Sequence, residues 1–150
     1  MELNLVVKAG TGVIVIKNGK VLTGIRKGSH GAGQRAFPGG HIDTTDKSLS
    51  EAGEREVLEE TGIRCKVRTL WPNDGVDLAS TFKILSDDGS KRYVTVYLVA
   101  DYLEGGKMLE DGSVEPLEPH KCSKWEWHTL DELRDLVVSQ SPDQVWIPIE

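Results

Sequence analysis

The sequence lacks several features that would place it in a specialised class of protein. It has only two cysteines, Cys65 and Cys122, and their spacing fits neither a disulfide framework nor a thiolate metal site. We therefore expect two free thiols in a reducing compartment. The sequence shows no signal-peptide pattern and no long apolar run, so we expect a cytoplasmic protein with no membrane partner.

The sequence also lacks an excess of positive charge. Its 18 lysines and arginines are outnumbered by 24 aspartates and glutamates, which gives a formal net charge of -6. Broad binding to nucleic acid or to anionic membranes requires a basic surface, so we expect no nucleic-acid partner. A small phosphorylated substrate is compatible with this charge, because a bound metal ion can supply the positive charge that the protein lacks.

No internal repeat, low-complexity segment or linker divides the chain, so we expect one domain over residues 1–150. Runs of β-branched and aromatic residues predict strands near residues 5–16, 21–25, 65–70, 80–85, 92–100 and 122–128. Asn18-Gly19 predicts a hairpin between the first two of these strands.

Two capping boxes predict two helices. Ser48 with Glu51 opens a helix near Leu49 that ends at Gly62, and Thr129 with Glu132 opens a second helix that extends to about Ser139. Strands that surround two helices imply an α/β fold with a mixed central sheet and a helix on each face.

The first predicted helix carries three glutamates on one face. Glu56, Glu59 and Glu60 are three and four residues apart, so their side chains lie together. Their repulsion destabilises the helix unless a cation cancels it, and Mg2+ prefers carboxylate and phosphate oxygens. From these residues alone, a solvated acidic face is the alternative interpretation.

The residues around this triplet resemble the signature of a known family. Residues 55–63 read arginine, glutamate, apolar, any, glutamate, glutamate, any, glycine, apolar, and Pro38-Gly39-Gly40 precedes them. This order resembles the Nudix box of the Nudix hydrolases. The usual box has five residues between glycine and a glutamate, and seven more before the arginine. Here Asp46 stands at the first position, and eight residues separate it from Arg55, so the role of Asp46 stays open.

Further segments are similar to a MutT-homologue subgroup of nucleoside triphosphate diphosphatases; they are residues 26–33, 38–41, 93–96, 118–122 and 125–127. This resemblance implies a Nudix-type α/β/α sandwich. It also implies Mg2+-dependent or Mn2+-dependent hydrolysis of a nucleoside triphosphate, with a normal or modified base, to the monophosphate and pyrophosphate. A homodimer is expected from the resemblance alone. Arg35 and Thr44-Thr45 depart from the subgroup, so its base preference is not carried over.

The resemblance also implies roles for individual residues. The metal ligands would be the carbonyl of Gly39 and the carboxylates of Glu56, Glu59, Glu60 and Glu118. Glu115 competes with Glu118 as the loop carboxylate, and Glu56 can instead act as the general base that activates water. Arg55 would orient a carboxylate and so belongs with the catalytic residues.

A basic, glycine-rich stretch over residues 26–38 precedes the acidic helix, and we expect it to hold phosphates. The candidate substrate-binding side chains are Arg26, Lys27, Arg35 and His41. A structural role is the alternative for His41. Trp125 and Trp127 alternate on a predicted strand and are expected to pack in the core rather than to stack on a base.

Three other functions stay open at this level. The first is hydrolysis of another nucleoside-diphosphate-linked substrate, such as a dinucleotide, ADP-ribose or an RNA cap, of which the cap fits the acidic charge least. The second is a nucleotide-binding module without turnover, which the extra residue and Asp46 favour and the intact glutamates oppose. The third is an acidic interaction protein that binds no nucleotide.

Overall fold

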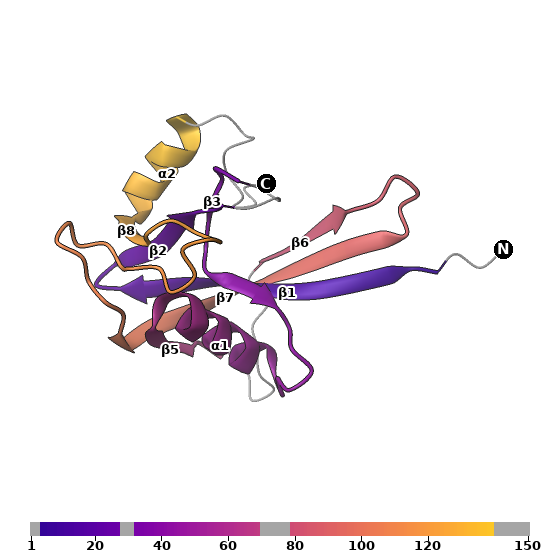
Figure 1. Ribbon diagram of the computed structural model, residues 1–150, viewed down its shortest axis with the longest axis horizontal. Coiled ribbons are helices and arrows are strands. Elements are labelled where there is room, and N and C mark those ends of the chain that lie inside the picture. Colours follow the sequence, from indigo (N-terminus) through magenta and orange to yellow (C-terminus); the bar gives the residue numbers. More distant parts are fainter. Residues whose placement is uncertain (1–3, 28–31, 70–78, 140–150) are drawn as a thin grey trace.

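The computed structural model describes residues 4–27, 32–69 and 79–139 (Figure 1). The parts of the predictions that concern residues 28–31, 70–78 and 140–150 lie outside the described residues. The described strands are β1 (Val6–Lys17), β2 (Lys20–Ile25), β3 (Arg35–Ala36), β4 (Gly39–His41), β5 (Ile63–Val67), β6 (Ala79–Ile84), β7 (Lys91–Gly105) and β8 (Glu126–Thr129). The helices are α1 (Leu49–Thr61) and α2 (Leu130–Ser139).

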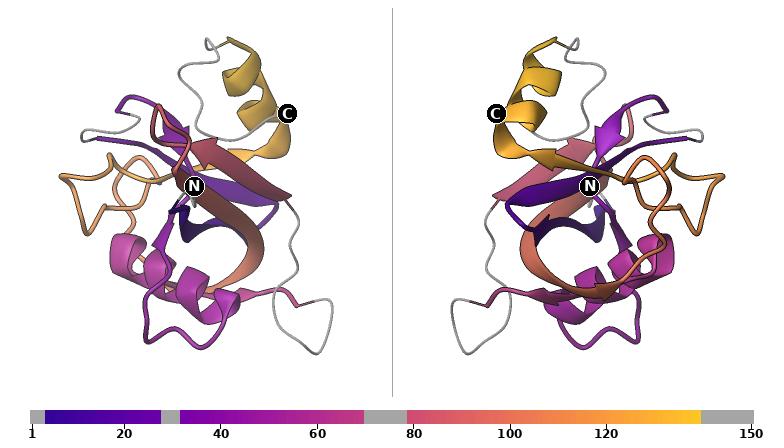
Figure 2. Two further views of the ribbon diagram at one scale, coloured as in Figure 1. Left: turned by 90° about the vertical axis from the view of Figure 1, so that its right-hand side faces the viewer. Right: turned by 90° about the vertical axis from the view of Figure 1, so that its left-hand side faces the viewer.

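The described strands form one mixed sheet in the order β3-β2-β1-β7-β5, with β4 paired to β1, β6 to β7 and β8 to β2. Its centre is the parallel pair β1–β7, which runs from Val6–Lys91 to Ile16–Asp101. The other pairs are antiparallel. The helices α1 and α2 lie on opposite sides of this sheet (Figure 2), which confirms the predicted α/β architecture.

The turn between β1 and β2 and the start of α2 lie at the residues that the sequence predicted. Asn18 and Gly19 have φ angles of 50° and 74°, as a tight hairpin turn requires, and they connect β1 to β2. At α2, Thr129 Oγ1 accepts from the N–H of Glu132 at 3.1 Å, and Glu132 Oε2 accepts from the N–H of Thr129 at 3.1 Å. The second capping box is therefore confirmed.

The helix α1 begins and ends at the predicted residues. Ser48 Oγ accepts from the N–H of Glu51 at 3.0 Å, and Glu51 Oε2 accepts from the N–H of Lys47 at 2.8 Å. The glutamate thus reaches one residue beyond the partner that it has in a regular capping box. Gly62 ends the helix at φ 73°, where its N–H donates to Leu58 O at 2.9 Å.

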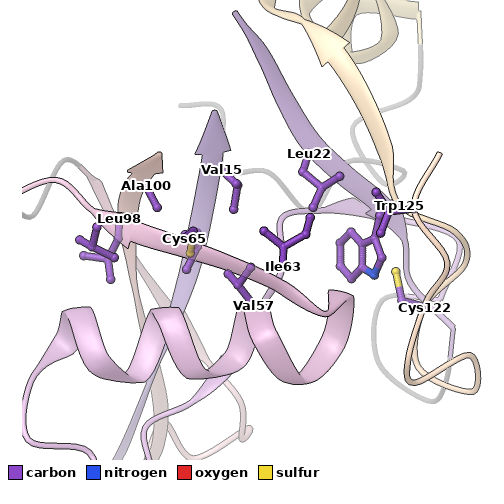
Figure 3. Close-up of a cluster of buried hydrophobic side chains, with 12 residues drawn as sticks. Val15, Leu22, Val57, Ile63, Cys65, Leu98, Ala100, Cys122 and Trp125 are labelled. Atoms are coloured by element: carbon purple, nitrogen blue, oxygen red, sulfur yellow. The ribbon is translucent and has the colours of Figure 1, made fainter. Parts of the chain in front are cut away.

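The core lies between α1 and the sheet (Figure 3). Val57 on α1 and Ile63, Leu98 and Val15 on the strands are fully buried. The helix α1 approaches β7 closely at Gly53, where a Cβ atom would lie 2.9 Å from Leu98 Cδ1. Trp125 is 3% exposed and joins this cluster, as predicted for a core tryptophan.

Both cysteines are buried and free, as predicted. In the part of the chain that the structure describes, no helix has the length and apolar character needed to span a membrane.

Two strands were not predicted. The sequence predicted no strand at β3 or β4, because strands of two and three residues are too short to show a periodicity. Backbone pairing fixes them, through Gly24–Ala36 for β3 and Gly12–Gly39 for β4. The predicted strand over residues 122–128 is shorter, because Cys122 and Trp125 form isolated bridges and continuous pairing starts at Glu126.

The N-cap of α1 gives a stability prediction. Replacing Ser48 by alanine leaves the N–H of Glu51 without its acceptor, and we expect a loss of about 1 kcal/mol in the free energy of unfolding, measured by urea denaturation. Ser48→Asp keeps an acceptor at the helix start and should lose much less. Equal losses for both variants would contradict the capping role.

Candidate active site

A cavity of about 900 Å³ lies where α1, β1, β4 and β7 meet the segment 118–125. Three carboxylates line it, from Glu56, Glu60 and Glu118. Basic side chains also line it, from Lys8, Arg26, Lys27 and Lys121. Its aromatic lining comes from Phe37, Tyr93, Tyr97 and Trp125. The cavity therefore combines negative, positive and aromatic groups in one space large enough for a nucleotide-sized ligand.

Most of the side chains singled out from the sequence meet at this cavity. Gly39 and His41 line it together with the acidic and basic residues above. Glu59, Arg35 and Glu115 do not line it. The structure thus brings Glu118, rather than its competitor Glu115, to the helix glutamates.

Arg55 connects the parts of the site from behind the cavity. Its Nε and Nη2 donate to the two carboxylate oxygens of Asp46 at 2.9 and 2.8 Å, and Nη2 also donates to His41 O at 3.0 Å. Its Nη1 donates to Glu56 Oε1 at 3.0 Å and to Glu59 Oε2 at 3.2 Å. One guanidinium therefore fixes the connector, β4 and the acidic face of α1 relative to one another.

Asp46 is the residue whose role the sequence left open. Its side chain is 2% exposed, and the bidentate contact with Arg55 holds the pKa of its carboxyl below the ordinary value. The connector folds into a turn here, with the N–H of Asp46 donating to Asp43 O at 3.0 Å and the N–H of Asp43 to Asp46 Oδ2 at 2.7 Å. This turn absorbs the extra residue and delivers the aspartate to Arg55.

Glu59 points away from the cavity. Its side chain is 53% exposed, and its contact is the one with Arg55. Glu59 therefore lies beside Glu56, since both accept from Arg55 Nη1, but it does not line the cavity that Glu56 and Glu60 line.

Glu60 is the most strongly perturbed carboxyl of the site. Burial raises its pKa to about 8, and the charges of Glu56 and Glu118 act in the same direction. The N–H of Gly39 donates to Glu60 Oε2 at 3.2 Å and partly offsets the burial. The pKa of Glu56 is also raised, first by burial and then by the neighbouring glutamates, against the opposing effect of Arg55.

The two glycines of β4 let the strand approach both neighbours. A Cβ atom on Gly39 would lie 1.9 Å from Thr11 O, and one on Gly40 would lie 2.7 Å from the carboxylate carbon of Glu56. Any side chain at either position would displace the strand or the carboxylate. The double glycine is therefore a steric requirement of this site.

The carboxylate oxygens are suitable ligands for a hard divalent cation, although they do not form a complete coordination sphere in this structure. Among the described residues, no three histidine, cysteine, aspartate or glutamate side chains stand together as a metal-binding group. Glu60 and Glu56 nevertheless present carboxylate oxygens as ligands. Burial and the charges of neighbouring glutamates disfavour the charged forms of both carboxyl groups. A divalent cation relieves both costs, and oxygen is the donor that Mg2+, Mn2+ and Ca2+ prefer.

Arg35 does not reach the cavity. It is 7% exposed, its Nη1 donates to Thr23 Oγ1 at 3.0 Å, and the same nitrogen lies 3.3 Å from His128 Nε2. Successive residues of a strand point to opposite sides, and on β3 it is Ala36 that lines the cavity. This placement does not support the phosphate-binding role that the basic stretch suggested for Arg35.

Two residues at the cavity were missed by sequence reasoning as site residues. Tyr93 Oη lies 3.1 Å from His41 Nδ1, and the two rings meet edge to face with centroids 5.4 Å apart. Tyr93 crosses β1 at Gly10, where a Cβ atom would lie 2.2 Å from its hydroxyl. Lys121 lies 2.9 Å from Glu118 Oε2. The contact of Tyr93 with His41 joins segments 52 residues apart, for which the sequence carries no local signal, whereas Lys121 pairs with a glutamate three residues before it in the chain.

A scan against protein-family models matches the NUDIX domain over residues 7–146 of the 150. The chain belongs to the Nudix hydrolase family. Members of this family hydrolyse the pyrophosphate linkage of nucleoside-diphosphate-linked compounds and generally use divalent metal ions. The acidic helix and the Pro-Gly-Gly turn at the cavity are thus the family's signature, as their resemblance indicated.

Solved structures share the fold of this Nudix hydrolase. A MutT Nudix hydrolase from Burkholderia pseudomallei is 23% identical with a TM-score of 0.62, over 85% of this chain and 86% of the other. A UDP-X diphosphatase is 18% identical with a TM-score of 0.58, over 85% of this chain and 53% of the other. An ADP-ribose pyrophosphatase from Streptococcus suis is 16% identical with a TM-score of 0.50, over 83% of this chain and 75% of the other.

The contact between Asp46 and Arg55 gives a second prediction. Asp46→Asn removes the negative charge and replaces one of the two accepting oxygens by an amide donor that faces Arg55, and we expect a loss of about 1–3 kcal/mol in the free energy of unfolding at pH 7. Asp101→Asn removes a bidentate contact to Arg68 that is half exposed, and should cost less than about 1 kcal/mol.

Because the folded state lowers the pKa of Asp46, its stabilisation is present above the ordinary value of 3.8. The difference between wild type and Asp46→Asn should therefore shrink as the pH falls below 3.8. Losses of similar size for Asp46→Asn and Asp101→Asn would contradict the structural importance of Asp46.

The raised pKa of Glu60 gives a third prediction. Between its ordinary value of 4.5 and about 8, the folded state holds a proton that the unfolded state releases, so stability falls as the pH rises. We expect the metal-free protein in chelator to lose about 2–4 kcal/mol over this range, measured by urea denaturation.

Glu60→Gln should reduce the fall in stability with rising pH. The lowered pKa of His128 makes stability rise with pH, so its contribution has the opposite sign to that of Glu60. A profile in which Glu60→Gln keeps the slope of the wild type would show that this carboxyl is not the source.

Proposed function

We propose that this Nudix hydrolase cleaves a nucleoside triphosphate, with a normal or modified base, to the monophosphate and pyrophosphate with Mg2+ or Mn2+. The observation that carries the proposal is the composition of the cavity. Partly buried carboxylates, four basic side chains and an aromatic lining share it. A triphosphate needs the positive charge, the metal needs the carboxylates, and a planar base suits the aromatic rings.

We assign the metal to the carboxylates that face the cavity. Glu56, Glu60, the carbonyl of Gly39 and Glu118 would hold the cation, and Glu59 would join them after leaving Arg55. A bound cation would neutralise phosphate oxygens and lower the pKa of a water molecule. Because the pKa of Glu60 is raised to about 8, a cation held by this carboxyl would have to displace its proton over the neutral pH range.

The protein's own side chains would orient the reaction. Arg55 holds Glu56 at 3.0 Å, so this carboxylate is fixed whether it ligates the metal or accepts the proton of the attacking water. Arg26 and Lys27 would bind the phosphates, and Lys8 lines the same cavity. Tyr93 contacts the ring of His41, which would meet the phosphate or the sugar.

A substrate panel tests the proposal. Nucleoside triphosphates with normal and modified bases are incubated with Mg2+, Mn2+ or chelator, and monophosphate, diphosphate, phosphate and pyrophosphate are quantified. We expect equal amounts of monophosphate and pyrophosphate from one or a few triphosphates, and none with chelator. Release of a sugar phosphate from UDP-linked compounds or from ADP-ribose instead would overturn the triphosphate assignment. If no compound is hydrolysed, the result would favour a nucleotide-binding module without turnover.

Variants of the glutamates give the fourth prediction. Glu60→Gln should lower kcat on the preferred substrate by about 100-fold or more, because it removes a charge that holds the cation. Glu104→Gln serves as the matched control, since this glutamate pairs with Arg64 at the exposed end of β7 and does not line the cavity. Activity that survives Glu60→Gln and falls in Glu104→Gln would show the metal assignment to be wrong.

A further inference from the structure

Lys121 places a positive charge directly at the carboxylate end of the cavity. Its Nζ lies 2.9 Å from Glu118 Oε2, and its side chain is 62% exposed while that of Glu118 is 28% exposed. The pKa of Lys121 is raised, first by the hydrogen bond to Glu118 and then, after an opposing effect of burial, by the charges of Glu118, Glu60 and Glu56. The ammonium thus sits in the field of the same carboxylates that we assign to the metal.

The backbone fixes where Lys121 can act. The N–H of Leu117 donates to Glu60 O at 2.9 Å, which attaches the segment to the end of α1. The N–H of Lys121 donates to Glu118 O at 2.9 Å, and the N–H of Lys27 donates to Lys121 O at 2.8 Å. The turn from Glu118 to Lys121 is therefore held between the acidic helix and the basic residues Arg26 and Lys27, while the long lysine side chain can change rotamer.

We infer that Lys121 is an exchangeable counter-ion, which neutralises Glu118 while the carboxylates hold no metal and moves to the substrate phosphates once a divalent cation takes Glu118. This inference rests on the proposed function. An ammonium and a divalent cation at one carboxylate repel each other, so binding of the cation disfavours the pair with Glu118. An ammonium has three donors and no acceptor, and the phosphates held beside Arg26 and Lys27 are the nearest anions left to it.

This exchange predicts effects of opposite sign from one substitution. In Lys121→Met the cation no longer competes with the ammonium, so Mn2+ alone should bind more tightly, by about two- to fivefold. The same variant lacks a phosphate ligand, so manganese tripolyphosphate should bind about tenfold more weakly. A lysine that merely stabilises the loop would weaken both, because the position of Glu118 would be lost.

The experiment measures both affinities with the full chain. Binding of Mn2+ is followed by the loss of the free-ion signal in electron paramagnetic resonance, and binding of manganese tripolyphosphate by calorimetry. Lys121→Arg should retain values near those of the wild type. Lys107→Met is the matched control, since Lys107 pairs with Glu115 at 3.3 Å in the same loop and does not line the cavity. It should change neither affinity.

A double-mutant cycle with Glu118→Gln isolates the pair. In the Glu118→Gln background, adding Lys121→Met should leave Mn2+ affinity unchanged, because the competing contact is already gone. Unchanged or weaker Mn2+ binding in Lys121→Met, or unchanged tripolyphosphate binding, would overturn the inference while the proposed function stands. Failure of the wild type to bind Mn2+ would overturn the metal site itself, and with it the inference.

Discussion

The arrangement of the cavity depends on the ion pair between Arg55 and Asp46. The connector, β4 and α1 are joined to one another at this guanidinium, which bonds the Asp46 carboxylate, the His41 carbonyl and the Glu56 carboxylate. Without the aspartate, the partly buried guanidinium of Arg55 would lose its bidentate partner, and the connector would lose its side-chain attachment to α1. The connector, with its extra residue, forms a turn from Asp43 to Asp46 that places the aspartate against Arg55.

The charged forms of the carboxylates at the cavity are destabilised by burial and by mutual repulsion. Glu56 and Glu60 are held close together and away from water by the steric fit of Gly39 and Gly40, and burial raises the pKa of both carboxyls. Such a site costs stability in the absence of a cation and recovers it on binding. Carboxyls whose pKa values are raised by burial and by neighbouring charges are commonly found at functional sites, where a bound ligand offsets the loss of stability.

Local signals allowed much of the fold to be predicted from the sequence. The ends of α1 follow from Ser48 and Gly62, and the first hairpin from Asn18-Gly19, because caps and turns depend on neighbouring residues. What could not be predicted depends on contacts between distant segments. Spacing predicted that Glu56, Glu59 and Glu60 lie together, but it could not predict that Glu59 is half exposed and does not line the cavity. Composition put Arg35 with the other basic residues, but the alternation of β3 turns it away from the cavity.

We propose that the carboxylates facing the cavity hold a divalent cation. The most direct measurement is an anomalous-difference map from crystals soaked in Mn2+, recorded at a wavelength where manganese scatters anomalously. The account predicts a peak in the cavity bounded by Glu56, Glu60 and the carbonyl of Gly39. A cavity without a peak at saturating Mn2+, or a peak held elsewhere while these carboxylates stay unliganded, would contradict it.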